Sequence, residues 1–402
     1  MRRRIGALVL ATLLGLGGCS LVGGDDNGGG SGPGSGSAGS SGGGADKGPT
    51  VALQPADKAT DVPVSAEIAI ADGEGELGDV TLADEAGQEV VGALREDGSS
   101  WVPAEPLAYT TTYTVTAKAT VDGEQAEAKT TFTTMARPGN RMRAHVYMAD
   151  NAVYGQAMPI VVEFSNGGLK DEQQRAIVEK RLFVRSEPAQ EGSWHWDSAS
   201  QIEYRPREFW RPGTRLDVRL GLGGLPLGDG RFGQVDITIK ASIDAVARSV
   251  VVENAGKRLT AYQNGRPVKT MPVSLGKPSA PSLSGKMVIM EKLANTVFDS
   301  STYGTPVDSA DGYRTKVKHA ERLTWDGQFI HAAPWSVASQ GRRNVSHGCV
   351  NVSPANGKWL YDWFRVGDLV EVKGTGHRLN QGNGWTAWDL SWEDFVAGSA
   401  LR

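Results

Sequence analysis

Apolar and polar residues alternate over short stretches along most of the chain after residue 50. In "TTYTVTAKATV", Tyr113 and Val115 share one side, and the threonines between them face the other way. Alternation with a period of two is typical of strands that bury one face. Asp122 and Gly123 then form a dipeptide that favours a tight hairpin turn. We therefore predict a small antiparallel β-sandwich over residues 49–136.

The same pattern continues through residues 137–246. "PIVVEFS", "QIEYRPR", "TRLDVRLGL" and "VDITIKA" are short strand-like runs separated by proline and glycine, and one short helix is expected from Asp171 to Lys180. Both regions are predicted to be Ig-like sandwiches. Trp194 and Trp196 have two interpretations, sugar stacking or core packing, and sandwich core is the usual place for such residues.

Residues 247–373 combine strands with one helix. The Asn264-Gly265 pair between two strand-like runs indicates a hairpin, and "LTWDGQFIH" contains a second turn. Ser353 followed by Pro354 is typical of a helix start, and "LVEV" after the helix predicts a buried strand. We expect a mainly β domain with a helix packed against it.

The C-terminal segment, residues 374–402, is rich in large aromatic residues. These are Trp385, Trp388, Trp392 and Phe395. So short a segment cannot build its own core, and we expect a subdomain packed on residues 247–373. The alternative is a surface that binds a partner. The predicted fold class is therefore mainly β.

The first residues have the pattern of an export signal. Arg2–Arg4 are positive, Ile5–Leu16 are mostly apolar, and two glycines precede Cys19. The stretch resembles the lipobox of bacterial lipoproteins, which implies removal of residues 1–18 and lipidation of Cys19. A plain secretory signal is the alternative. Residues 19–48, rich in glycine and serine, predict a flexible tether. The resemblance places the protein in the cell-wall space, lipid-anchored to the outer face of the cytoplasmic membrane.

Composition narrows the possible functions. The formal net charge is −4, and no basic cluster suggests nucleic-acid binding. Beyond the signal, no segment is expected to span a membrane. The chain has 2 cysteines, and lipidation of Cys19 would leave Cys349 without a disulfide partner within the chain. An unpaired thiol in an exported protein is a candidate for reactive chemistry.

The residues around Cys349 support a nucleophilic role. A thiol needs a base or a lowered pKa to attack, and two histidines are candidates. His347 lies two residues before Cys349, on the same face if the chain is extended there, and His331 lies 18 residues upstream. Gly348 adds backbone freedom and an amide for an oxyanion. The pattern indicates a Cys–His acyl-transfer site.

Three other interpretations of these residues were weighed. Cys349 could be a buried structural thiol. His331, His347 and Cys349 could instead bind catalytic zinc, with His319 as a fourth ligand, although the chain has no H-E-x-x-H helix. The third is a cell-wall-binding lipoprotein without enzymatic activity.

The stretch "SHGCVN" at 346–351, preceded by "HAAPW" at 331–335, resembles the signature of the L,D-transpeptidases. "STYGTPVDSADGYRT" resembles the lid region of that family, and "NVSPANGKWLYDW" its post-catalytic helix. The layout also resembles the mycobacterial lipoprotein type with two Ig-like domains. The resemblance covers essentially the whole chain.

The resemblance implies a role for each matching residue. Cys349 would be the nucleophile, His331 the general base and then acid, and His347 a supporting residue. The oxyanion hole would use the Cys349 amide, beside Gly348, and the Tyr313 hydroxyl. Substrate would contact Ser346, Asn351, Asp326, Gly327 and Trp335. The residue after the base is often serine in this family, whereas this chain has Ala332, which serves equally if the third group acts through its backbone carbonyl.

The implied reaction joins peptidoglycan stem peptides. The thiolate would attack the carbonyl before the terminal D-Ala of a tetrapeptide stem, and D-Ala would leave a thioester. A neighbouring diamino-acid amine would then form a 3→3 cross-link, whereas water would give carboxypeptidase activity. The resemblance implies no metal or cofactor, and it implies inhibition by β-lactams, especially carbapenems. Arg342 and Arg343 either meet stem carboxylates or are simply solvated.

Overall fold

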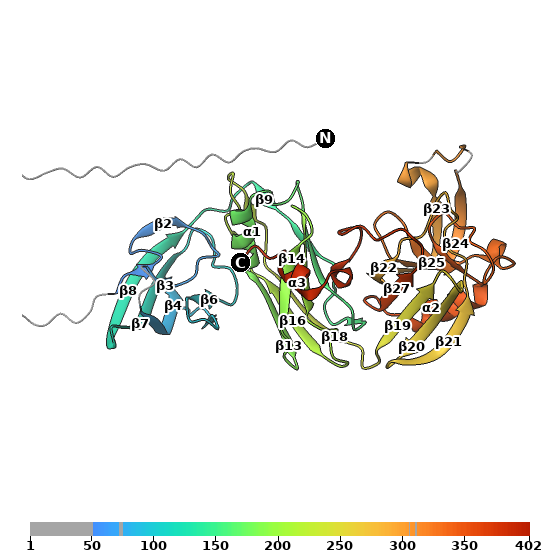
Figure 1. The fold of residues 1–402 in the computed structure, drawn as a ribbon. Helices are drawn as coiled ribbons and strands as arrows, with labels where there is room; N and C mark the ends of the chain where they lie inside the picture. Colours follow the sequence, from blue (N-terminus) through green and yellow to red (C-terminus); the bar gives the residue numbers. More distant parts are fainter. Residues whose placement is uncertain (1–50, 72–74, 305, 310–311) are drawn as a thin grey trace, which may run out of the picture. The chain divides into compact units, whose positions relative to one another are not determined.

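The computed structural model describes residues 51–71, 75–304, 306–309 and 312–402 (Figure 1). The predicted signal peptide, the predicted lipidation site Cys19 and the whole predicted tether lie outside these residues. Within the described part of the chain, no helix is both long and apolar enough to cross a membrane. The described chain is rich in strands, which confirms the mainly β fold class.

The first β region has a sheet in the order β2-β8-β7-β4 and two smaller pairs, β1-β3 and β5-β6. Its strands are β1 (Leu53–Gln54), β2 (Ala59–Val62), β3 (Ala69–Ile70), β4 (Glu76–Asp84), β5 (Gly92–Leu94), β6 (Trp101–Pro103), β7 (Thr112–Val121) and β8 (Glu124–Thr134). The predicted hairpin is confirmed, because Asp122 and Gly123 join β7 to β8 with φ values of 54° and 83°. Tyr113 and Val115 are buried, as their alternation predicted.

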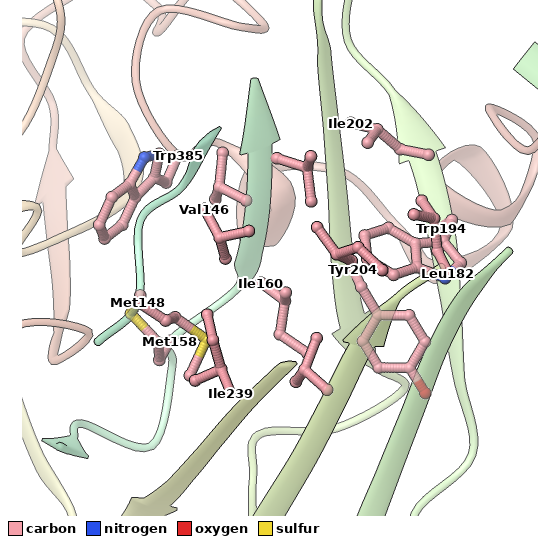
Figure 2. Close-up of a cluster of buried hydrophobic side chains, with 14 of the residues drawn as sticks. Val146, Met148, Met158, Ile160, Leu182, Trp194, Ile202, Tyr204, Ile239 and Trp385 are labelled. Carbon is pink, nitrogen blue, oxygen red and sulfur yellow. The ribbon is translucent and has the colours of Figure 1, made fainter. Parts of the chain in front are cut away.

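The second β region pairs the sheet β10-β12-β15-β14 with the sheet β11-β18-β16-β13, beside a short β17-β9 pair. Its elements are β9 (Arg141–Met142), β10 (Ala144–Val146), β11 (Val153–Tyr154), β12 (Ile160–Phe164), α1 (Glu172–Glu179), β13 (Leu182–Glu187), β14 (Gly192–Trp196), β15 (Gln201–Pro206), β16 (Arg215–Leu220), β17 (Phe232–Gly233) and β18 (Ile237–Ile243). The helix was predicted, and Asp171 caps it by accepting bonds from two backbone amides. Trp194 and Trp196 are buried, so the core interpretation is correct. Trp194 is seen in Figure 2.

The C-terminal aromatic residues pack differently from our prediction. Trp385 and Trp388 belong to a core that is formed mainly by the second β region and that also contains Val288, Met290 and Leu369 of the third region. Trp385 is drawn beside Val146 (Figure 2). Helix α3 (Trp392–Val396) follows the short η3 (Ala387–Asp389) and contacts β14. Only Leu379 of this segment joins the main core of the third region.

Arg205 explains this docking of the C-terminal segment. The guanidinium of Arg205 donates to the carbonyls of Ala387, Leu390 and Ser391 and lies 4.6 Å from the Trp388 ring centroid. The segment is therefore anchored on the second β region as well as on residues 247–373, where η3 contacts β22 and the Lys286 amide donates to Asp389.

The third region combines the sheet β21-β20-β19-β27-β22 with the sheet β23-β24-β25-β26. Its elements are β19 (Arg248–Glu253), β20 (Arg258–Gln263), β21 (Arg266–Pro272), β22 (Gly285–Val288), β23 (Glu291–Asp299), η1 (Ser300–Tyr303), β24 (Arg314–Arg322), β25 (Phe329–Ala332), η2 (Pro334–Ser336), β26 (Val350–Val352), α2 (Pro354–Trp363) and β27 (Leu369–Lys373). The predicted hairpin at Asn264 and the predicted helix α2 are both present, and Ser353 caps α2.

Helix α2 positions the second of these sheets. It packs against β24 and β25, and its Leu360 is buried in the same core as Ile330 and Val350. Alternate residues of β25 and β26 fill that core. The residues between them, including His331 and Asn351, therefore face the other side of the sheet.

Candidate active site

Two adjacent strand ends bring the candidate nucleophile and base together. Strand β25 carries His331 and runs parallel to β26, with His331 opposite Asn351. Cys349 immediately precedes β26 and joins Phe298 and Phe329 in a small buried cluster. The His331 ring packs edge-on against Phe298, with 5.1 Å between ring centroids. The thiol and the imidazole therefore lie around the same aromatic cluster, on the face of the sheet opposite α2.

The backbone carbonyl of Ala332 orients the His331 ring. Nδ1 of His331 lies 3.1 Å from this oxygen. A carbonyl only accepts, so Nδ1 carries the proton and Nε2 keeps its lone pair for a proton from the thiol. No side-chain hydroxyl is needed for this contact. Alanine in place of serine at position 332 therefore does not change the contact that orients the His331 ring.

Both reactive groups are neutral at rest. Burial raises the pKa of the Cys349 thiol to about 12, an effect only partly opposed by the Phe329 amide. Burial also lowers the pKa of His331 to about 4, although the Ala332 carbonyl and the Asn351 side chain oppose this shift. The thiol donates to the Gly327 carbonyl, with 3.6 Å between Sγ and oxygen. The resting site therefore holds a neutral thiol and a neutral imidazole.

The loop between Ser346 and Cys349 is bent, so the extended strand that we assumed for His347 is wrong. Gly348 has a φ of +124°, a conformation that side-chain-bearing residues rarely adopt. His347 is exposed on this bend. Its Nε2 lies 3.0 Å from Nζ of Lys277, and its ring centroid lies 5.2 Å from that of Tyr313. The Tyr313 ring in turn packs against the cluster that contains Cys349.

Ser346 holds the bend, and its contact with substrate stays a prediction. Its side chain is buried, and its hydroxyl donates to the Cys349 carbonyl at 2.6 Å. The hydroxyl oxygen of Ser346 also accepts a hydrogen bond from the Gly348 amide at 3.2 Å. Both hydrogen bonds close the turn from within. The hydroxyl therefore stabilises the loop that presents the nucleophile.

Sequence reasoning missed Ser282. Its hydroxyl donates to the Gly348 carbonyl at 2.6 Å and accepts from the Gly276 amide at 2.9 Å. Ser282 therefore anchors the catalytic loop to a segment 66 residues earlier in the chain. No local sequence signal marks this serine, because its partners come from tertiary folding.

The other predicted substrate contacts occupy different parts of the site. Asn351 is only 2% exposed and faces His331 across the ladder, and its Oδ1 has no hydrogen-bond partner. The structure thus places Asn351 beside His331, and its contact with substrate stays a prediction. Asp326 is exposed, and its amide donates to Asn383 Oδ1 at 3.2 Å. Trp335 is 57% exposed, and its ring centroid lies 5.9 Å from that of His331.

The zinc interpretation needs several ligands in one place. In the part of the chain that the structure describes, no three His, Cys, Asp or Glu side chains are grouped to hold a metal ion. His319, the suggested fourth ligand, lies at a bulge in β24 with a φ of 50°. Its ring faces Tyr361 of α2, with 5.5 Å between centroids.

Comparisons with known proteins agree with the order of the regions. A bacterial Ig domain family matches residues 59–226, and an L,D-transpeptidase catalytic domain family matches residues 247–372. L,D-transpeptidase 2 of Mycobacterium tuberculosis is 36% identical over 353 residues, which cover 88% of this chain and 85% of that protein. L,D-transpeptidase 5 of the same species is 33% identical over 88% of this chain and 77% of its own length.

One solved structure similar to this chain is an L,D-transpeptidase in complex with imipenem. It is 35% identical and covers 57% of this chain and 97% of its own length, with a TM-score of 0.48.

Proposed function

The chain belongs to the L,D-transpeptidase family, and from this premise we propose that Cys349 forms a thioester with a tetrapeptide stem and passes it to a second stem as a 3→3 cross-link. The observation that carries the proposal is the oriented base. His331 donates through Nδ1 to the Ala332 carbonyl, which leaves Nε2 for the thiol proton.

In the first half-reaction, Nε2 of His331 takes the proton from Sγ while sulfur attacks the carbonyl before the terminal D-Ala. The oxyanion accepts hydrogen bonds from the Cys349 amide and the Tyr313 hydroxyl. The carbon–nitrogen bond then breaks, and His331 returns the proton to the leaving amine. The products are a thioester and free D-Ala.

In the second half-reaction, the side-chain amine of a neighbouring stem attacks the thioester. His331 removes a proton from that amine, and the carbon–sulfur bond breaks. The proton then returns to sulfur, which restores the resting thiol. Water in place of the amine would give a carboxypeptidase product by the same steps.

The neutral resting pair makes proton transfer part of the attack. A free thiolate is costly in this buried site, and an imidazolium is costly for the same reason. Proton transfer therefore occurs as sulfur bonds to carbon, when the negative charge moves to the oxyanion. Substrate binding supplies the groups that make this transfer favourable.

A thiol that forms thioesters also attacks strained cyclic amides. We therefore propose that carbapenems acylate Cys349 and block the enzyme. The test is intact-protein mass after carbapenem treatment of the wild type and Cys349→Ala. We expect one adduct on the wild type and none on the variant. An unmodified wild type would contradict the thioester mechanism.

Product formation tests the reaction itself. Incubation with purified disaccharide-tetrapeptide should give cross-linked dimers and one D-Ala per dimer, detected by mass spectrometry. His331→Gln should abolish both products. Stoichiometric zinc in the active protein, or activity lost to a chelator, would instead favour a metal-dependent peptidase.

We also propose that the protein is exported and held at the outer face of the cytoplasmic membrane by a lipid on Cys19. The motif before Cys19 supports this proposal. Metabolic labelling with a palmitate analogue should mark the wild type and leave Cys19→Ala unlabelled. Label on both proteins would contradict it.

A further inference from the structure

Strand β24, which pairs with the strand of the catalytic base, contains one irregular position. His319 has a φ of 50°, in the left-handed region that few residues with a side chain adopt. The register with β25 changes there, because Lys318 pairs with Ala332 whereas Ala320 pairs with His331. Two steps along β24 therefore match one step along β25. This is a β-bulge, and it lies directly beside the base.

The bulge changes which side chains of β24 face the thiol. Residues three positions apart lie on opposite faces of a regular strand. Val317 and Ala320 are three positions apart, yet both belong to the buried cluster that contains Cys349. Because Ala320 pairs with His331, the bulge places a small side chain beside the imidazole.

The two residues that follow Ala320 carry opposite charges and face opposite sides of the sheet. Arg322 pairs with Phe329, and its guanidinium lies 4.5 Å from the centroid of that ring, which belongs to the cluster of Cys349. From there Arg322 lowers the pKa of the Cys349 thiol. Glu321 is buried and pairs with Ile330, whose side chain lies in the core beneath α2. The register therefore turns the cation toward the thiol and the carboxyl group away from it.

Regular pairing would reverse this arrangement, because a slip of one residue moves every side chain to the other face. Without the extra residue, pairing continued beyond Lys318 would set His319 opposite His331. It would also set Glu321 opposite Phe329. A carboxylate would then replace the guanidinium beside the thiol, and a nearby negative charge disfavours thiolate. The bulge therefore decides which charge lies beside the nucleophile.

The side chain of His319 is held on the other side of the strand. Its ring packs against Tyr361 of α2, with 5.5 Å between centroids, and α2 itself packs on β24 and β25. Its buried Nδ1 has no hydrogen-bond partner among the described residues. Ring packing, rather than a bond to Nδ1, therefore holds the side chain. Histidine also adopts the left-handed region more readily than most residues do.

We propose that His319 is a positioning residue, whose left-handed backbone sets the register that turns Ala320 and Arg322 toward the thiol. This inference rests on the proposed function, in which the thiol of Cys349 attacks while His331 takes its proton. The His319 ring faces α2, so the residue acts on the site through the strand and not by direct contact.

The experiment compares three substitutions at position 319. His319→Asn and His319→Gly readily adopt a positive φ, whereas the β-branched side chain of His319→Val disfavours it. All three remove the imidazole, so a difference between them reports the backbone. The kcat for release of D-Ala from disaccharide-tetrapeptide is measured by mass spectrometry. We expect His319→Asn and His319→Gly to stay within about threefold of the wild type and His319→Val to lose about 10- to 100-fold, the usual cost of moving a reacting group by about 1 Å.

Alkylation of Cys349 by iodoacetamide tests the register without the transpeptidase reaction. In His319→Val, the carboxylate that replaces the guanidinium should slow alkylation about threefold for each unit by which the thiol pKa rises. Adding Glu321→Gln to His319→Val should restore most of that rate, because it removes the charge. Glu321→Gln alone is the matched control and should alkylate at the wild-type rate, since its side chain faces away from the thiol. A variant that is only less stable would not show this recovery.

The outcomes separate the possible failures. Equal kcat in His319→Val and His319→Asn, or equal losses in all three substitutions, would overturn the role of the backbone at position 319. An alkylation rate in His319→Val that Glu321→Gln does not change would overturn the change of register. If chemical unfolding shows that His319→Val does not fold, His319→Ala takes its place, because alanine also disfavours a positive φ. A wild type that releases no D-Ala would overturn the proposed function, and the alkylation rates would still decide the register.

Discussion

The thiol of Cys349 should be neutral in the empty site, so that alkylating reagents react slowly with its small fraction of free thiolate and not with an ion pair. Burial raises the pKa of this thiol from the ordinary 9.0 to about 12. Three pKa units reduce the thiolate fraction near pH 7.5 by about 1000-fold. The more basic thiolate is intrinsically more nucleophilic, which recovers about 25-fold. The net expectation is a rate about 40-fold below that of an ordinary thiol.

His331 does not change this expectation in the empty site. Its pKa of about 4 lies about 8 units below that of the thiol. Transfer of the proton between them would therefore populate the ion pair in only about one molecule in 10⁸. The fraction of molecules with a free thiolate exceeds one in 10⁸ at any pH above about 4. The alkylation rate should therefore rise with the thiolate fraction.

The assay is the rate of iodoacetamide addition between pH 6 and pH 10.5, followed by intact mass. The logarithm of the rate should rise by about one per pH unit throughout, without a plateau. His331→Gln should show the same slope. A plateau in the wild type between pH 6.5 and pH 9 that disappears in His331→Gln would refute the neutral pair and indicate a resting thiolate–imidazolium pair.

Three further predictions follow from the contacts in the structure. His331→Gln should reduce the acid sensitivity of the fold: the folded-state pKa of His331 is lowered from 6.5 to about 4, so the unfolded chain binds the extra proton and about 3 kcal/mol of stability is lost as the pH falls between these values. Chemical unfolding at pH 7 and pH 4 measures the stability of the two proteins. An equal loss of stability between these pH values in both proteins would contradict the prediction. Ser282→Ala should cost about 1–3 kcal/mol and lower kcat, because it leaves the Gly276 amide and the Gly348 carbonyl without their partner. A variant with normal stability and kcat would show that the anchor is dispensable. Arg205→Met should cost about 3 kcal/mol and release the C-terminal segment first, because three backbone carbonyls lose their donor. Limited proteolysis measures this release, and unchanged cleavage within residues 374–402 would contradict it.

Local elements were the most predictable part of the fold. The turns at Asp122 and Asn264, the capped helix that begins at Pro354 and the buried alternate residues of β7 were all recognisable, because each depends on neighbouring residues. The pairing of His331 with Cys349 stays a prediction from the sequence, and both residues contact the same aromatic cluster. There the signal was the resemblance of a short motif and not a calculation of geometry.

Contacts between distant segments could not be predicted in the same way. The aromatic residues after position 374 were expected to pack against the preceding region, but the acceptors for Arg205 place them on the second one. The motif singled out Ser346, but it gave no sign that the Ser346 hydroxyl closes the loop from inside. These outcomes depend on which hydrogen-bond partners the fold brings together, and spacing along the chain does not contain that information.

The sequence by itself determined the mainly β fold class and the resemblance to the family, and it predicted Cys349 as nucleophile and His331 as base, because periodicity and a short motif are local properties of a chain. Only the tertiary structure decided the protonation, burial and hydrogen-bond partners of these residues. It placed the proton of His331 on the nitrogen facing the Ala332 carbonyl, buried the thiol so that it stays neutral, and brought Lys277 and Ser282 to the catalytic loop. The physical reason is that burial and hydrogen-bond partners arise from segments many residues apart, which meet only when the sheets pack.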